Sequence, residues 1–211
     1  ENKDADLLTQ PVSTAALFAA GSSLVQLGFA TVDESFNRES DGFTGLANLT
    51  YFVNEEVMVF ASASSGTKSG GFNGVAAEGF SREFKDEDST NYELGIKSEL
   101  FNNRLRINAT AFYTEFSDLQ SLAQQPSGVG TYVSNAAEGT SAGVDLNVSA
   151  APWEFLMLSG GLQYLDAEYT DGILSEQNFD VPYAPTWSGN VSATFLLPVA
   201  EGVSYLRGDY S

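Results

Sequence analysis

From residue 43 onward, apolar and polar residues alternate with period two in one segment after another. In the clearest segment, 91–100, Leu94 and Ile96 alternate with Glu93 and Lys97. Because successive side chains of a β-strand point to opposite faces of its sheet, this pattern predicts strands with one apolar and one polar face. We expect about eight strands of roughly ten residues each, a length that suits a tilted strand crossing a membrane. The strands are expected near 43–53, 57–66, 90–100, 104–116, 135–150, 156–168, 185–197 and 203–211.

The connections between the predicted strands are alternately short and long. Short ones such as 54–56 and 101–104 contrast with long ones near 67–89, 119–134 and 168–184, which are rich in Gly, Ser, Asp and Gln. Outer-membrane barrels have short turns at the periplasmic end and long loops at the external end. The alternation therefore favours an all-β fold, a transmembrane antiparallel up-and-down β-barrel.

Charge separates the two faces of the predicted strands. We expect the apolar faces of all eight strands to be free of charged residues, and their aromatic residues gather near the strand ends. A Lys or Arg on a lipid-facing position costs about 2–4 kcal/mol at the middle of the bilayer, so we expect the apolar faces to meet lipid. A soluble sheet would instead hide its apolar face inside the molecule, and this alternative stays open. The residues expected to face the lumen are Glu93, Lys97, Glu99, Arg106 and Asp145.

Composition excludes several function classes. The chain has 211 residues with 9 Lys+Arg and 28 Asp+Glu, giving a net charge of −19, and it has no His and no Cys. Strong acidity argues against a nucleic-acid partner, because phosphate binding needs clustered Lys and Arg. The missing His and Cys remove the usual general base, thiolate chemistry and most zinc sites. We therefore expect no enzyme, no catalytic residue, no metal site and no cofactor, although a hydrolase built on a carboxylate pair and a Ca²⁺ ion in the acidic run 166–172 stay open.

Six different segments, taken together with their order and spacing along the chain, resemble those of a known family. They are VFASASSGTKSGGFN at 59–73, NYELGIKS at 91–98, AFYTEFSDLQ at 111–120, NAAEGTSAGVDL at 135–146, YLDAEY at 164–169 and RGDYS at 207–211. Together they resemble the C-terminal part of the barrel of TonB-dependent outer-membrane receptors. Ala63, Ser65 and Thr67 stand where that family has Tyr, Arg and Phe.

The resemblance implies a barrel of about 22 strands that an N-terminal plug closes. We expect this chain to be a fragment, with eight strands in 43–211, the tail of a long external loop in 1–42, and no plug domain. The implied function is energy-coupled import of a scarce ligand such as a ferric siderophore. The implied partners are outer-membrane lipid, the small-molecule or metal-chelate ligand, and a TonB energy-coupling complex that contacts absent N-terminal parts. The implied location is the outer membrane of a Gram-negative bacterium, crossed several times.

Two other function classes stay open. The chain could form a small closed outer-membrane barrel that acts as an anchor or adhesin, or a soluble acidic β-sheet module that binds a partner. For a receptor, the candidate ligand-binding residues are Lys68, Arg82 and Lys85, the basic residues of the 67–89 loop. An ordinary solvated loop charge is the alternative for each of them. The acidic loop 168–184 would repel an anionic chelate.

Overall fold

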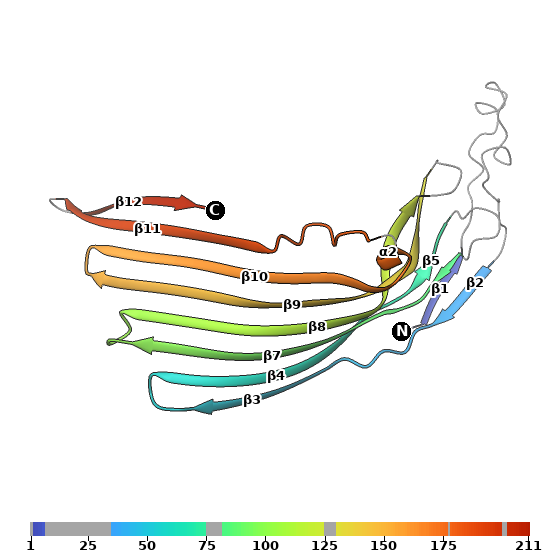
Figure 1. Cartoon of the computed structure of the whole chain (residues 1–211), viewed down its shortest axis with the longest axis horizontal. Coiled ribbons are helices and arrows are strands. Elements are labelled where there is room, and N and C mark those ends of the chain that lie inside the picture. The colour runs from blue at the N-terminus through green and yellow to red at the C-terminus, as the bar shows by residue number, and fades with distance from the viewer. Residues whose placement is uncertain (1, 7–34, 75–81, 125–129, 177, 200–201) are drawn as a thin grey trace, which may run out of the picture.

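Most of the chain forms one eight-stranded antiparallel sheet (Figure 1). The computed structural model describes residues 2–6, 35–74, 82–124, 130–176, 178–199 and 202–211. Each main strand pairs with the next one along the chain, so the expected all-β, up-and-down arrangement is confirmed. The strands in order are β3 (Gly45–Phe52), β4 (Val57–Lys68), β7 (Glu87–Leu100), β8 (Leu105–Gln124), β9 (Thr131–Trp153), β10 (Leu156–Gly172), β11 (Trp187–Val199) and β12 (Gly202–Tyr210).

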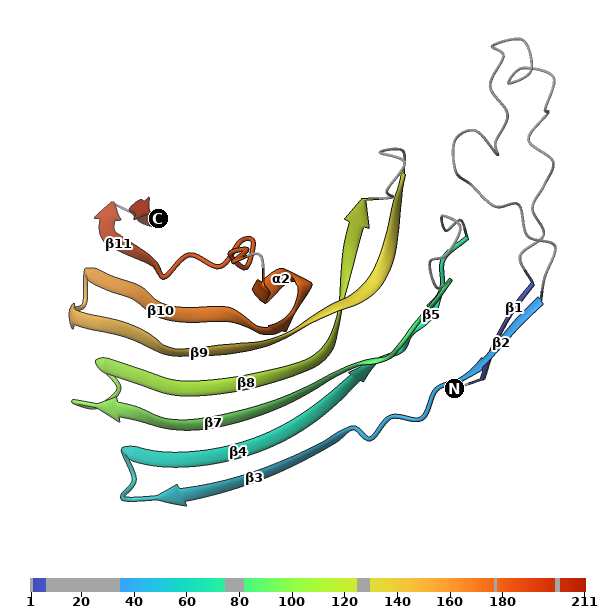
Figure 2. The ribbon, with the colours of Figure 1, turned by 45° about the vertical axis from the view of Figure 1, so that its right-hand side comes forward.

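Smaller elements lie at the end of the sheet where the long connections are. The pair β1–β2, the pair β5–β6 and the helix α2 occupy this end, opposite the short turns (Figure 2). Their bounds are β1 (Asn2–Asp6), β2 (Ser35–Glu39), β5 (Gly71–Phe72), β6 (Glu83–Phe84) and α2 (Ile173–Glu176). We call this side of the sheet the loop end and the other side the turn end.

The segment 1–42, expected as the tail of an external loop, contains the antiparallel pair β1–β2. Its residues 7–34, which include the apolar stretch Ala15–Ala30, lie outside the described residues. Within the part of the chain that the structure describes, no helix is long and apolar enough to cross a membrane.

The register aligns the predicted alternation across the sheet, because directly paired residues lie on the same face. One row of directly paired residues contains Leu49, Ala61, Leu94, Ala111, Val144, Tyr164 and Trp187. The next row, on the opposite face, contains Thr50, Phe60, Gly95, Thr110, Asp145, Gln163 and Ser188. We call these two surfaces the apolar face and the polar face.

The sheet is a single layer whose apolar face is uncovered. Among the large apolar side chains of the described residues, Leu94 is 65% exposed and Val191 is 54% exposed, whereas Leu156 is 8% exposed. A soluble monomer rarely leaves a continuous apolar surface of more than a few hundred Å² open to water. This face therefore needs lipid or another protein surface against it.

The polar face is crowded where phenylalanine stands opposite glycine. Phe60 pairs directly with Gly95, and Phe112 pairs directly with Gly143. A Cβ atom added at Gly95 would lie 2.3 Å from the Phe60 ring, and one added at Gly143 would lie 2.6 Å from the Phe112 ring. Glycine is therefore required at both positions so that a ring can lie over the backbone.

The strands β8 and β9 run further than expected, and they turn away from the plane of the sheet at the loop end (Figure 2). The expected loop 119–134 is thus wrong in its described part, which extends this two-stranded ribbon. The reason is an irregularity at Asp118, which has φ 53°, together with a register shift between Phe116 and Leu119. A bulge interrupts the period-two pattern, so the alternation does not reveal the strand beyond it.

Acidic residues occur on the apolar face beyond the aromatic residues. On β8 the apolar face is uncharged from Leu105 to Tyr113, but Glu115 follows in the same alternation. Glu115 and Glu168 both pair with Thr140, so they share one row. Asp166 also lies on this face, in the row of Tyr113, because both pair with Ala142. The expected absence of charge therefore holds for the central band of the apolar face and is wrong for the loop end of the expected strands 104–116 and 156–168.

Candidate functional site

Five short segments that are distant in sequence meet at the loop end. They are 38–40, 68–73, 82–87, 118–120 and 133–135, and side-chain hydrogen bonds join them. We call this group the loop clasp. It surrounds the three basic residues that the sequence nominates for ligand binding.

Asp86 is the ionic centre of the loop clasp. Its carboxylate accepts hydrogen bonds from the Gly70 N–H at 2.5 Å, the Ser40 hydroxyl at 2.8 Å and the Arg38 guanidinium at 3.0 Å. Arg38 also pairs with Glu83, and the side chains of Arg38 and Asp86 are 13% and 15% exposed. Burial alone would raise the pKa of Asp86, but these three donors outweigh burial and hold the pKa below its usual range.

Two asparagine carboxamides imitate strand partners for backbone that belongs to another segment. The Asn73 Nδ2 donates to the Val133 carbonyl at 2.8 Å, and its Oδ1 accepts from the Val133 N–H at 2.7 Å. The Asn135 Oδ1 accepts from the Lys85 N–H at 2.7 Å, and its Nδ2 donates to the Lys85 carbonyl at 3.1 Å. Asn135 Nδ2 also donates to the Asp118 carbonyl at 2.7 Å. These contacts satisfy backbone groups of Lys85, which lies between β6 and β7, and of Val133, which pairs with Leu122 on the β8 side of β9.

Gln120 adds a third amide to the loop clasp. Its backbone N–H donates to the Glu87 carboxylate at 2.8 Å. Its side-chain Nε2 lies within hydrogen-bond distance of the carbonyls of Lys68 at 3.2 Å, Ser69 at 3.2 Å and Lys85 at 3.0 Å. The β8 extension is thereby joined to both ends of the 69–87 segment.

The sequence Ser69–Asn73, read SGGFN, makes this arrangement possible. A Cβ atom at Gly70 would lie 2.3 Å from the Phe84 carbonyl oxygen, so a side chain at this position would push β6 away. Gly70 instead offers its N–H to Asp86. The glycine is needed for close backbone approach, a common reason for glycine in or beside a strand.

Each of the three candidate ligand residues contacts an acceptor. Lys68 Nζ lies 3.4 Å from a Glu87 carboxylate oxygen, and its side chain is 61% exposed. Lys85 Nζ lies 3.2 Å from an Asp118 carboxylate oxygen, and its side chain is 70% exposed. Arg82 donates to the Gly74 carbonyl at 3.3 Å. The three cations belong to one region of the loop end, but these contacts give them no common acceptor.

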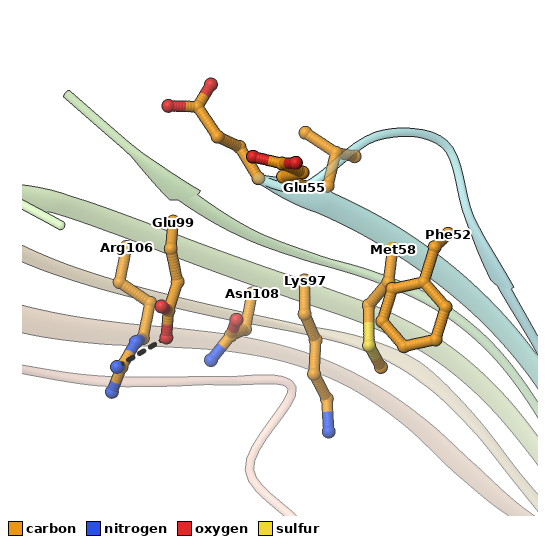
Figure 3. Close-up of a pocket in the computed structure, with 9 residues that line it drawn as sticks. Phe52, Glu55, Met58, Lys97, Glu99, Arg106 and Asn108 are labelled. Atoms are coloured by element: carbon orange, nitrogen blue, oxygen red, sulfur yellow. Dashed lines mark hydrogen bonds and ion pairs between the residues drawn. The ribbon is translucent and has the colours of Figure 1, made fainter. Parts of the chain in front are cut away.

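The five residues expected to face the lumen all lie on the polar face. Each of them lies an odd number of residues from a member of the apolar row on the same strand, and side chains alternate between the two faces. They come from β7, β8 and β9. Figure 3 shows Lys97, Glu99 and Arg106 reaching to the same side of the sheet at the turn end, where they help line a hollow of about 440 Å³. Arg106 donates to Glu99 at 2.5 Å, and Lys97 Nζ lies 5.2 Å from the centroid of the Phe60 ring.

The described residues contain no cluster of side chains suited to bind a metal ion. Within them, no group of three or more Asp or Glu residues is arranged to hold a metal ion. The carboxylates at the loop end instead accept hydrogen bonds from neighbouring segments, as Asp86 and Glu87 do.

The family model described as TonB dependent receptor-like, beta-barrel matches residues 19–211. The chain belongs to this family. The resemblance seen in the sequence is thereby confirmed, and family membership favours the receptor over an adhesin or a soluble binding module. The family is one of outer-membrane transport receptors rather than enzymes.

Two curated relatives are metal-pseudopaline receptors. The chain is 33% identical over 138 residues to the metal-pseudopaline receptor CntO of Pseudomonas aeruginosa strain UCBPP-PA14, a match that covers 65% of this chain and 18% of that receptor. CntO of strain PAO1 is 35% identical over 120 residues, which is 57% of this chain and 16% of that receptor. The chain thus spans about a fifth of the length of these relatives.

Solved receptor structures share the fold. The ferric yersiniabactin uptake receptor FyuA from Yersinia pestis superposes with a TM-score of 0.69 at 23% identity, over 82% of this chain and 26% of that chain. The ferric preacinetobactin receptor BauA from Acinetobacter baumannii gives a TM-score of 0.62 at 21% identity, over 83% of this chain and 26% of that chain. These likenesses confirm that the sheet has the form of part of a receptor barrel.

The sequence alone did not nominate the residues that build the loop clasp. Asn73, Gln120 and Asn135 occur inside segments quoted for the family resemblance, but no role was assigned to them. The signal that points to Asn73 is the SGGFN sequence, because adjacent glycines indicate close backbone approach. Nothing in the sequence near Asp86 separates it from its acidic neighbours.

Proposed function

We propose that the full-length receptor containing this chain imports a scarce metal chelate, such as a ferric siderophore, across the outer membrane by TonB-energised uptake. The observation that carries the proposal is the family match over 19–211. The printed names of CntO, FyuA and BauA, which are receptors for metal-pseudopaline, ferric yersiniabactin and ferric preacinetobactin, support a metal chelate as the class of ligand. TonB contact would be made by parts of the receptor other than the strands described above.

In this proposal the apolar face meets outer-membrane lipid and the polar face lines the lumen. The uncovered aliphatic side chains on one face and the charged side chains on the other support this orientation. The ring-over-glycine packing at Gly95 and Gly143 also supports it, because side chains crowd on the inner face of a curved sheet. The chain would cross the membrane of a Gram-negative bacterium several times.

We further propose that Lys68, Arg82 and Lys85 contact an anionic part of the ligand. Their support is their position at the loop end and the large exposed fractions of Lys68 and Lys85. Exposed ion pairs contribute about 0–1 kcal/mol, so an incoming carboxylate or catecholate could replace Asp118 beside Lys85 at low cost.

Uptake by a deletion strain tests the proposed function. The strain is complemented with the full-length gene and given radiolabelled iron as ferric yersiniabactin or ferric preacinetobactin, or a radiolabelled metal as its pseudopaline complex. We expect accumulation of at least one complex to require both the receptor and TonB. Equal accumulation in the deletion strain, or accumulation that continues without TonB, would contradict the proposal.

A further inference from the structure

The contacts between the described parts of the 69–87 loop and of the extended β8–β9 ribbon share one form. Asn73 bonds to both the N–H and the carbonyl of Val133, which is 60 residues away. Asn135 bonds to both the N–H and the carbonyl of Lys85, which is 50 residues away. Each carboxamide therefore occupies the place that a neighbouring strand would take.

The two contacts are reciprocal. Asn73 belongs to the 69–87 segment and holds the 118–135 segment, whereas Asn135 belongs to 118–135 and holds 69–87. A carboxamide bonded through both its oxygen and its nitrogen to one residue has a fixed orientation. Two such joints pointing in opposite directions resist the sliding or hinging that a single hydrogen bond would allow.

Gln120 closes the same pair of segments at a third point. Its N–H donates to Glu87, and its Nε2 lies near the carbonyls of Lys68, Ser69 and Lys85. The described parts of both segments are thus joined near their bases and near Val133. By contrast, 38–40 is held through Asp86 and Glu83, by contacts that are largely ionic.

We propose that the described parts of the two segments, 69–74 with 82–87 and 118–124 with 130–135, form one cooperative unit that opens and moves as a single body, with Asn73 and Asn135 as its joints. The coupling follows from the contacts alone, and it rests on the proposed function only in making these segments part of the ligand-capturing end. A ligand that displaced either segment would then displace the other, without any contact to it.

Hydrogen exchange on the full-length receptor in detergent micelles, without ligand, tests the coupling. Amides that exchange through one cooperative opening lose protection together when any bond of the unit is removed. Asn73→Ala removes the two bonds to Val133. We expect the Gln120 N–H, which Asn73 does not contact, to exchange faster by a factor on the order of tenfold. The Val133 N–H, which loses its own acceptor in this variant, should accelerate by at least as much.

The reciprocal variant is Asn135→Ala, read at the Gly70 N–H that Asp86 holds. The matched control is Asn147→Ala, which removes a carboxamide from the polar face of β9 and should leave all these amides unchanged. Heat-modifiable migration in gels confirms that each variant barrel is folded. If Asn73→Ala proves unstable, Asn73→Asp keeps the acceptor for the Val133 N–H, loses the donor, and should give a smaller change with the same pattern.

Faster exchange confined to Val133 in Asn73→Ala, with Gln120 unchanged, would overturn the proposal and show two independent loops. Because the measurement uses neither ligand nor uptake, it can fail while the proposed import function holds, and the reverse is also true.

Discussion

On the polar face, the rings of Phe60 and Phe112 lie over the backbone of the glycines that pair with them, Gly95 and Gly143. The Phe60 ring lies over Gly95 while the Lys97 ammonium lies 5.2 Å from the same ring. Such a cation over an aromatic face contributes about 0.5–1 kcal/mol at an exposed site. The absence of a side chain at Gly95 thus lets the Phe60 ring of the neighbouring strand β4 lie close to β7, where it contacts Lys97.

Gly143→Ala should destabilise the full-length barrel. The new Cβ atom would lie 2.3 Å from the Tyr164 carbonyl oxygen and 2.6 Å from the Phe112 ring, so backbone must shift. Overpacking of this kind costs about 1–3 kcal/mol. The temperature at which the folded gel band disappears measures the effect.

The matched control for this change is Gly66→Ala, also within a paired strand, where the nearest atom is the Ser89 hydroxyl oxygen at 3.4 Å. Equal melting of the two variants would show that the sheet absorbs the methyl group at Gly143, and it would contradict the packing described here.

At the scale of the strand, the alternation of residue types was enough to predict which side chains share a face. It works because the side-chain period of a strand is fixed at two, so Leu94 and Ile96 must lie together. The same counting fails at Asp118, where an extra residue resets the alternation. The β8–β9 extension was missed for that reason.

The contacts of the candidate site were harder to predict from the sequence than the faces of the strands. Charge nominated Lys68 and Lys85, but charge does not reveal that Glu87 and Asp118 face them. Contacts across 50 or 60 residues, such as that of Asn135, depend on how hairpins stack at one end of the sheet. Asparagine is common in loops for local reasons, so its type alone carries no such information.

Nitroxide labels should distinguish the two faces within one strand. In the full-length receptor, labels at Leu94 and Ile96 should be accessible to oxygen dissolved in lipid, whereas labels at Glu93 and Lys97 should be accessible to a water-soluble relaxation agent. The reason is that neighbouring residues of a strand point to opposite faces. Oxygen access that is equal for the two pairs would contradict the assignment of lipid and lumen.

Acid should release β2 from the loop clasp. The pKa of Asp86 lies below its ordinary value of 3.8, so its contribution is fully present above that pH and is lost as pH falls through the lowered value. The groups facing Asp86 are the Arg38 guanidinium, which stays charged, the Ser40 hydroxyl and the Gly70 N–H. A nitroxide at the exposed Glu39 should be immobilised at neutral pH and mobile in acid.

Asp86→Asn is the control for the acid experiment, because it removes the ionisable group. The label in this variant should be mobile already at neutral pH and should respond little to acid. A label that stays immobilised in both proteins throughout the titration would refute the role given to Asp86.

At the scale of the whole chain, the sheet has two exposed surfaces and two unpaired edges. Among the described residues, β3 and β12 each pair on one side, so their outer N–H and carbonyl groups lack a strand neighbour. The net charge of −19 opposes association between copies, but it does not satisfy those groups.

The 211-residue chain expressed alone without detergent should therefore aggregate. The apolar face, which includes Leu94 and Val191, would meet water, and the edges would pair with other copies. Size-exclusion chromatography and light scattering measure the outcome, with the same chain refolded in detergent as the control. A monodisperse monomer that melts cooperatively in plain buffer would contradict the membrane orientation.

In the proposed orientation, the uncharged band of the apolar face would also set how deep the protein sits in the bilayer. From Leu105 to Tyr113 there are eight residue steps, or about 26 Å along the strand at about 3.3 Å per residue. Asp166 on β10 lies in the row of Tyr113, because both pair with Ala142, and Glu115 and Glu168 lie one row further toward the loop end. In the proposed orientation, sinking by two residues would carry these three carboxylates toward hydrocarbon, whereas rising would lift aliphatic side chains into the headgroups. The boundary between the uncharged band and these acidic residues would thus fix the height of the loop clasp above the membrane.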